Sequence, residues 1–205
     1  MRLIVGLGNP GAQHSGHRHN VGFMAAGAIA RRHGFSPARE KFHSLAAEGT
    51  LAGDKALILW PQTYMNDSGR AVQAAMQFYK AEPGDVVVLY DEIDLEFGKV
   101  RVKKGGGAAG HNGIRSVDAH IGPDFWRVRI GVGHPGVKEH VKHYVLHDFD
   151  AEEKPEVEKM IGAIADNFAL LFARGHEHFM TKVALAINPP PPKPPRNEPQ
   201  DGNGA

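Results

Sequence analysis

Imidazole, amide and carboxylate side chains follow the predicted strands of this sequence, close to the points where helices are predicted to begin. Asn9 comes after the first apolar run and a turn rich in glycine, and His19 lies just before a helical pattern that starts near Val21. Asp91 directly follows the apolar run 86–90. Ligands bind at the carboxyl ends of strands in open α/β sheets. These side chains are therefore candidates for a binding or catalytic site.

Two further polar clusters lie at predicted helix starts. Segment 64–69 contains Asn66, and the glycine-rich segment 105–113 contains His111 and Asn112. The polar side chains of the first segment could instead cap a helix, since they accept hydrogen bonds from unpaired N–H groups. The glycine-rich segment is either a flexible connection or a loop that brings backbone N–H groups close to an anion.

Gly6, Gly8 and Gly11 match the G-x-G-x-x-G spacing of dinucleotide-binding folds. That fingerprint requires a tight turn from strand to helix, so that the helix N-terminus meets the pyrophosphate. Here Pro10 intervenes, and the helix is predicted to start only near residue 20. The carboxylate expected about 20 residues later for the ribose is also missing. A nicotinamide enzyme is therefore disfavoured.

The composition limits the class of protein. With 205 residues and a formal net charge of +1, the chain suits one domain, and any nucleic-acid surface must be a local patch. The absence of cysteine excludes disulfides, thiolate nucleophiles and cysteine metal sites. No apolar run approaches the ~20 residues of a membrane span, and the first strand begins too early for a signal peptide. We expect a cytoplasmic protein.

Hydrophobic periodicity predicts strands that alternate with helices. The predicted strands are Arg2–Leu7, Ser44–Leu51, Ala56–Trp60, Val86–Tyr90, Lys99–Lys103 and Arg127–Val132, and the predicted helices are Val21–Arg32, Ser68–Tyr79, Asn112–His120, Glu152–Phe172 and Glu177–Leu185. This alternation predicts a single three-layer α/β domain, in which helices flank a mixed, mostly parallel twisted sheet.

The predicted domain spans residues 1–187. Residues 188–205 are rich in proline, glycine and polar residues, a composition that cannot bury a core and predicts a disordered tail. The proline-rich run could alternatively dock in an aromatic groove as a polyproline helix.

Several blocks of this sequence, in one order, resemble bacterial peptidyl-tRNA hydrolases. The blocks are Gly6-Leu7-Gly8-Asn9-Pro10-Gly11, Arg18-His19-Asn20-Val21-Gly22-Phe23, Pro61-Gln62-Thr63-Tyr64-Met65-Asn66-Asp67-Ser68-Gly69, Asp91-Glu92-Ile93-Asp94-Leu95, Gly110-His111-Asn112-Gly113 and Arg127-Val128-Arg129-Ile130-Gly131-Val132-Gly133-His134-Pro135. Together they span about residues 2–185, so only the proline-rich tail lies outside the resemblance.

The resemblance implies a monomeric hydrolase without a metal or other cofactor, which cuts the ester between a peptide and the 3′-terminal ribose of tRNA. It implies that His19 is the catalytic histidine, that Asp91 orients and polarises it, and that Asn9, Asn66 and Asn112 position water and substrate. It further implies that Met65 and His111, with Tyr64 and His14 near the substrate 3′ end, contribute to binding. Lys103 and Arg129 match the basic pair that grips the tRNA 5′-phosphate.

The chemistry agrees with these implied roles. No serine or cysteine elbow is evident, so water activated by a neutral histidine is the economical mechanism. An unperturbed imidazole has a pKa of about 6.5 and accepts a proton near neutrality. For the tRNA, the basic positions 101, 103 and 104 accompany 127 and 129 on another predicted strand. They could bind phosphates without reading sequence, or form only a solvated strand face.

The sequence departs from the family at three positions. His14 stands where tyrosine is usual, His17 where threonine is common, and Ala109 where glycine is common. His14, His17 and His19 together could also suggest a metal site. The rival to the enzyme is a non-catalytic RNA-binding relative with the same fold, since fold does not imply function. A second rival is a hydrolase of small acylated nucleosides.

Overall fold

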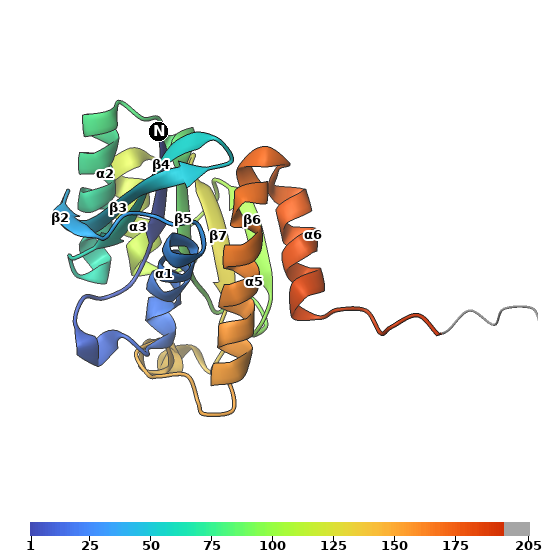
Figure 1. The fold of residues 1–205 in the computed structure, drawn as a ribbon. Helices are drawn as coiled ribbons and strands as arrows, with labels where there is room; N and C mark the ends of the chain where they lie inside the picture. The colour runs from blue at the N-terminus through green and yellow to red at the C-terminus, as the bar shows by residue number, and fades with distance from the viewer. Residues whose placement is uncertain (195–205) are drawn as a thin grey trace, which may run out of the picture.

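The computed structural model describes residues 1–194, which form one sheet with helices on both faces (Figure 1). The strands are β1 (Arg2–Gly6), β2 (Arg39–Lys41), β3 (Ser44–Leu51), β4 (Asp54–Pro61), β5 (Val86–Glu92), β6 (Val100–Lys104) and β7 (Trp126–Gly131). The helices are α1 (Val21–Arg32), α2 (Ser68–Tyr79), α3 (Asn112–Ile121), α4 (Val141–Val145), α5 (Lys154–Ala173) and α6 (His176–Ile187).

The sheet is mixed around a parallel centre, with the strand order β2-β3-β4-β1-β5-β7-β6. The pairs β4–β1, β1–β5 and β5–β7 are parallel, whereas β2–β3, β3–β4 and β6–β7 are antiparallel. The carboxyl ends of β4, β1 and β5 therefore lie side by side at one edge of the sheet, where such folds bind ligands.

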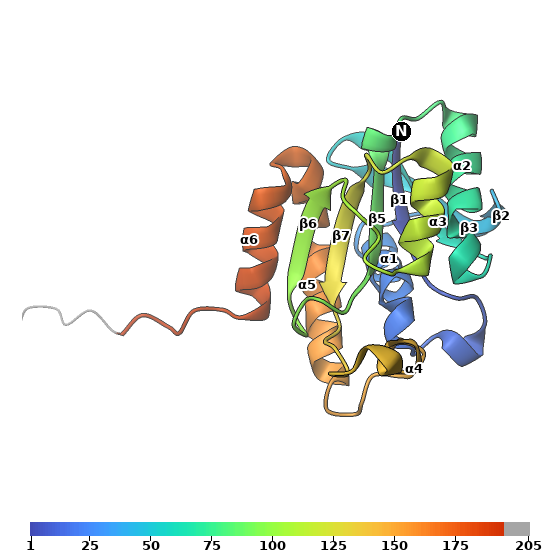
Figure 2. The ribbon, with the colours of Figure 1, turned by 180° about the vertical axis from the view of Figure 1, so that it is seen from behind.

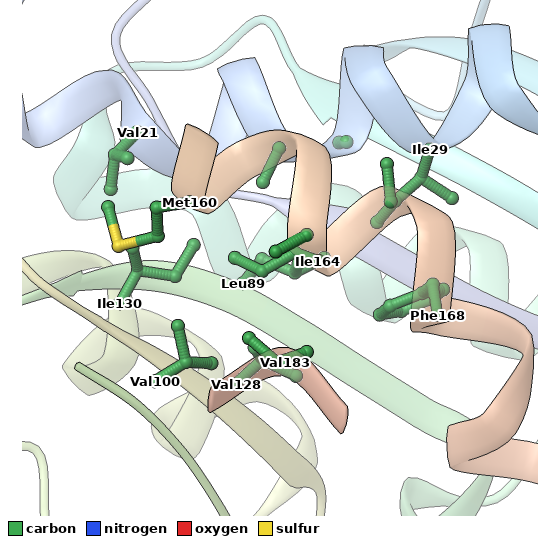
Figure 3. Packing of buried hydrophobic residues seen from close by; sticks show 14 of the residues in the cluster. Val21, Ile29, Leu89, Val100, Val128, Ile130, Met160, Ile164, Phe168 and Val183 are labelled. Atoms are coloured by element: carbon green, nitrogen blue, oxygen red, sulfur yellow. The ribbon is translucent and has the colours of Figure 1, made fainter. Parts of the chain in front are cut away.

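Side chains that alternate along the central strands build a separate core on each face of the sheet. On one face, Ile4 and Leu89 pack with apolar residues of α1, α5 and α6, among them Ile164 and Phe168 (Figure 3). On the other face, Leu3 and Val5 pack with apolar residues of α2 and α3. Figure 2, turned by 180° from Figure 1, shows these two helices on that face. Two cores separated by one sheet confirm the predicted three-layer α/β domain.

All of the predicted strands and helices are confirmed, with ends that coincide or are shifted by one or two residues. One short strand and one short α-helix were missed because both are too short to show a hydrophobic period: β2 has three residues, all exposed, and α4 has five residues, little more than one turn. The predicted tail, 188–205, lies largely outside the described residues; up to residue 194 it forms no helix or strand. Within the described part of the chain, no helix is long and apolar enough to cross a membrane.

Gly22 allows α1 to start in close contact with the central strands. A Cβ atom added at this position would lie against the backbone oxygen of Leu89 and against backbone atoms of Leu7. The Phe23 N–H also donates to the Leu7 carbonyl at 3.1 Å. The residues just before α1, which include His19, are therefore held at the carboxyl ends of β1 and β5.

We predict that Gly22→Ala lowers the free energy of unfolding by about 1–3 kcal/mol, because backbone atoms that cannot move aside cause overpacking. Gly27→Ala, in the same helix, is the matched control. Its Cβ would meet only the Arg31 guanidinium, at 3.4 Å, so stability should stay constant or rise by up to ~1 kcal/mol. Urea unfolding of both variants measures the difference, and equal effects would contradict the close approach.

Candidate active site

A cleft of about 890 Å³ opens at the carboxyl ends of β1, β4 and β5. Its lining includes the following residues that the sequence singled out: Asn9, His19, Tyr64, Met65, Asn66, Asp91, His111 and Asn112. They come from segments far apart in the chain: the loop after β1, the segment after β4, the end of β5 and the start of α3. The structure thus brings all five predicted catalytic residues to one cavity.

His19 and Asp91 form a hydrogen-bonded pair at the bottom of the cleft. His19 lies in a short 3₁₀ turn, Arg18–Asn20, that leads into α1, and Asp91 is the sixth residue of β5. His19 Nδ1 lies 2.8 Å from Asp91 Oδ2, and the Asp91 side chain is almost completely buried. The pair directs the other ring nitrogen of His19, Nε2, away from Asp91, so Nε2 is the atom available for chemistry.

His111 is a second partner of Asp91, and its hydrogen bonds fix its tautomer. Its Nδ1 accepts the backbone N–H groups of Gly113 and Ile114, at 3.1 and 3.3 Å, and so caps the N-terminus of α3. An acceptor nitrogen carries no proton, so the proton of the neutral ring is on Nε2. This Nε2–H donates to Asp91 Oδ1 at 2.8 Å. One carboxylate therefore accepts a hydrogen bond from each of two imidazoles.

This arrangement keeps Asp91 ionised and makes His19 more basic. Burial by itself raises the pKa of Asp91, but the charges of His19 and His111 and their hydrogen bonds hold it far below its usual range. Burial lowers the pKa of His19, yet the charge of Asp91 and the hydrogen bond to it raise that pKa above the usual value. The site therefore has the electrostatics of a base whose protonated form is stabilised by a buried carboxylate.

Asn9 is held by bonds that leave its amide nitrogen free for a ligand. Its Oδ1 accepts the Met65 N–H at 2.9 Å. Its backbone N–H donates to Asn20 Oδ1, and its carbonyl accepts from Asn20 Nδ2, both at 2.9 Å. The sequence indicated Asn20 as an amide beside His19 at the predicted helix start but gave it no role, and the structure shows that it holds the backbone of Asn9. Asn9 Nδ2 makes no hydrogen bond within residues 1–194 and can donate into the cleft.

The alternative that segment 64–69 merely caps a helix is wrong. Asp67 occupies the N-cap position of α2 but makes no side-chain cap bond, and instead pairs with Arg70 at 3.0 Å. The Ser68 hydroxyl donates to the Met65 carbonyl at 2.8 Å. Asn66 is exposed in the cleft, and Tyr64, with 78% of its surface exposed, lies at the rim. The amide of Asn66 is therefore available for a ligand.

The glycine-rich segment does not present the start of α3 to an anion. The N–H groups of Gly113 and Ile114 are already bound to the His111 ring. Ala108, Ala109 and Gly110 line the cleft, and Ala109 has a positive φ of 47°. A left-handed backbone favours glycine, so alanine at this position adds strain to the cleft wall.

His14 is not brought to the cleft. Its ring packs against His17, with centroids 5.0 Å apart, and neither Nδ1 atom has a partner in the described part of the chain. The alternative metal site of His14, His17 and His19 is therefore not assembled. The group whose geometry could hold a metal is instead His19, Asp91 and His111. There a metal would have to displace the Nε2 proton of His111 while Nδ1 stays bound to backbone N–H groups, so this donor set suits protons better than a metal.

The basic residues of β6 and β7 lie outside the cleft. One of the basic positions that the sequence offered for phosphate binding, Arg127, does not have that role. Arg127 is completely buried: it pairs with Asp118 at 2.8 Å and donates to two backbone carbonyls, so it cannot bind phosphate. Arg129 lies beside Tyr90 in the sheet register, and the Tyr90 ring contacts the His111 ring with centroids 5.1 Å apart. Lys103 and Arg129 therefore remain half-buried candidates one strand away from the cleft.

One wall of the cleft comes from residues of which the sequence singled out only His134, as part of a matching block. His134, Lys138, Val141, Lys142, Val145 and Leu146 line the side formed by α4 and the residues before it. The two lysines line the same cleft as the acidic residues at positions 91, 92 and 94. The cluster of histidine and lysine in 134–147 was the signal that could have indicated this wall.

The geometry can be compared with known proteins. A family model described as Peptidyl-tRNA hydrolase matches residues 3–191. A peptidyl-tRNA hydrolase of Parvibaculum lavamentivorans is 59% identical over 204 residues, covering 99% of this chain and all of the relative. One of Gluconobacter oxydans is 57% identical and covers 90% of this chain and 98% of the relative. The crystal structure of the Acinetobacter baumannii peptidyl-tRNA hydrolase superposes with a TM-score of 0.84 at 38% identity, covering 89% and 94% of the two chains.

The matched region contains the sheet except for its first residue, Arg2, and every residue that lines the cleft. More than half of the residues are identical to those of the two bacterial relatives over nearly the full length of the chain. The fold is also that of a solved peptidyl-tRNA hydrolase. The chain therefore belongs to the peptidyl-tRNA hydrolase family, whose members are ester hydrolases acting on peptidyl-tRNA.

Proposed function

We propose that this chain hydrolyses the ester between the peptide and the 3′-terminal ribose of peptidyl-tRNA with water that His19 activates. The single observation that carries the mechanism is the pair of 2.8 Å hydrogen bonds from His19 and His111 to Asp91. These bonds place the free nitrogen of His19 in a cleft large enough for an acylated nucleotide end. Release of tRNA from such esters recycles tRNA stranded in translation, so the proposed place of action is the cytoplasm.

The proposed reaction starts with a water molecule beside His19 Nε2. Nε2 takes a proton from water as the oxygen attacks the ester carbonyl, and the imidazolium that forms is stabilised by Asp91. The proton then passes from Nε2 to the 3′-oxygen of the ribose as the acyl–oxygen bond breaks. The products are a free peptide carboxylate and tRNA with its 3′-hydroxyl restored.

The amides supply neutral hydrogen bonds around the reacting carbonyl. Asn9 Nδ2 is oriented into the cleft, because Oδ1 is bound to the Met65 N–H. Asn66 and Asn112 are exposed at the same cleft. Neutral donors can hold the attacking water or the developing oxyanion without lowering the basicity of the imidazole. All these groups come from one chain, which supports activity as a monomer.

We further propose that Lys103 and Arg129 bind the 5′-phosphate end of the tRNA. The register places Arg101 opposite Arg129, and Lys103 is two residues along β6, so the three side chains share one face of the sheet. This is the face of Tyr90, which contacts His111 in the cleft. A phosphate held there would place the acceptor end of the same tRNA near the cleft.

Lys103→Ala is expected to raise the KM for peptidyl-tRNA. It should also reduce the slope of log KM against log salt concentration by about 1, because one fewer counterion is released on binding. The reason is the loss of one cationic contact with phosphate. Lys104→Ala is the matched control, since Lys104 has the same charge on the same strand but lies on the opposite face, near Trp126. Steady-state kinetics at several salt concentrations measures both. Equal effects of the two variants would contradict the proposed phosphate contact.

The decisive test of function is the release of free tRNA from a defined peptidyl-tRNA, with the matching aminoacyl-tRNA as the control substrate. Turnover of the former supports an enzyme, and tRNA binding without turnover would instead support the non-catalytic RNA-binding alternative. A peptidyl-adenosine fragment completes the comparison. If the fragment were cleaved as efficiently as peptidyl-tRNA, the basic face of β6 and β7 would have no role in the reaction.

A further inference from the structure

We propose that Arg18 is a positioning residue, which holds α4 in place as a wall of the cleft and thereby sets the affinity for substrate. This inference rests on the proposed function. Arg18 directly precedes His19 in the same 3₁₀ turn, yet its side chain points away from the cleft and is only 5% exposed. Nothing in the reaction proposed above uses this buried cation.

The guanidinium connects three segments that are distant in the sequence. Nη1 donates to the carbonyls of Asp148 and Tyr144, at 2.9 and 3.3 Å, and Nη2 pairs with Glu153 Oε2 at 2.8 Å. The guanidinium carbon lies 4.2 Å from the centre of the Tyr144 ring. Arg18 thus binds the end of α4, the loop after it and the residue before α5 with one planar group, as arginine but not lysine can do.

The α4 segment has few other contacts that could hold it. Of the residues from 138 to 148, only Val145 is buried. The other anchors include the Tyr144 hydroxyl, which donates to the Val132 carbonyl at 2.6 Å, and the Arg18 N–H, which donates to the His147 carbonyl at 2.9 Å. The last residue of the segment, Asp148, also lies beside His17. Few buried apolar contacts mean low local stability. The hydrogen bonds and ring contact of Arg18 therefore decide whether this wall stays in place.

The wall matters because it presents groups to the cleft. Lys138, Val141, Lys142, Val145 and Leu146 line the cavity on this side. By contrast, His19 and Asn20 have their own anchors in Asp91 and Asn9. Loss of the Arg18 side chain should therefore loosen the wall and leave the base in position, which separates substrate binding from chemistry.

Arg18→Lys tests this, because it keeps the charge but loses the two carbonyl bonds and the flat ring contact. We expect the KM for peptidyl-tRNA to rise about tenfold, which corresponds to the loss of one or two hydrogen bonds. The kcat should stay within about twofold of that of the unaltered chain, and the pH dependence of kcat should not change. Backbone amides of residues 141–149 should exchange with deuterium faster. His33→Ala is the control: it removes a 2.8 Å bond from α1 to the Ala165 carbonyl of α5, which should lower stability and leave KM unchanged.

Two further variants keep the test decisive if Arg18→Lys does not fold. Tyr144→Leu removes the ring contact, and Glu153→Gln removes the shorter of the two ion pairs that Arg18 makes, the longer one being with Asp150 at 3.6 Å. Both variants should raise KM and amide exchange in the same segment. A fall in kcat at constant KM would overturn the inference, as would unchanged KM and exchange. Absence of peptidyl-tRNA hydrolysis by the unaltered chain would refute the proposed function instead, while amide exchange would still report on the contact between Arg18 and α4.

Discussion

Replacement of His19 by alanine is expected to lower kcat by a factor of about 10² to 10⁴, the usual contribution of a general base. The methyl group that remains cannot accept a proton from water, and no other side chain takes the place of Nε2 beside the ester. His111 cannot substitute, because its Nδ1 is bound to the start of α3. Single-turnover hydrolysis of a defined peptidyl-tRNA measures the loss directly.

The pH profile gives a second readout of the same role. The neighbouring carboxylate raises the pKa of His19, so the base is protonated, and kcat is low, up to a higher pH than for an ordinary imidazole. His43→Ala, at the exposed turn between β2 and β3, is the control for removal of a histidine. Near-normal turnover by folded His19→Ala protein would refute water activation by this residue.

Replacement of Asp91 by asparagine is expected to lower kcat by up to about 10⁴, as in hydrolytic triads with the same change. The physical reason is the tautomer of His19. An amide has one acceptor oxygen, and the Nε2–H of His111 takes it, because the backbone fixes the His111 proton on Nε2. The amide NH₂ then faces His19 Nδ1, which must accept, so the His19 proton moves to Nε2 and the base is lost.

The pH dependence separates this explanation from a general loss of structure. Without the carboxylate, nothing opposes the effect of burial, so the pKa of His19 falls and the acidic limb of any remaining activity moves to lower pH. Asp166→Asn, which breaks an exposed pair with Arg32 at 2.7 Å, should leave rate and profile unchanged. An Asp91→Asn profile that coincided with that of the unaltered chain would contradict the coupling of His19 and Asp91.

The sequence predicted the layered α/β fold well, because the central strands and the long helices have strong hydrophobic periods. Residues 86–90, and Ile164 with Phe168, can be buried only against other apolar elements, so the structure of these segments follows from local pattern. The exposed strand Arg39–Lys41 and the helix Val141–Val145 are too short to show such a period. Their structure depends on contacts with distant segments, which explains why they were missed.

The same distinction applies to the cleft. The sequence by itself determined which chemical groups are present and that most of them follow strands, since residue type and periodicity are local properties. Only the tertiary structure decided that Asp91 serves two imidazoles, that His14 faces His17, and that Arg127 is buried against Asp118. These outcomes depend on the directions in which side chains point, between residues as far apart as His19 and Asp91 and as close as His14 and His17. Local sequence does not encode such directions, because packing of the whole domain sets them.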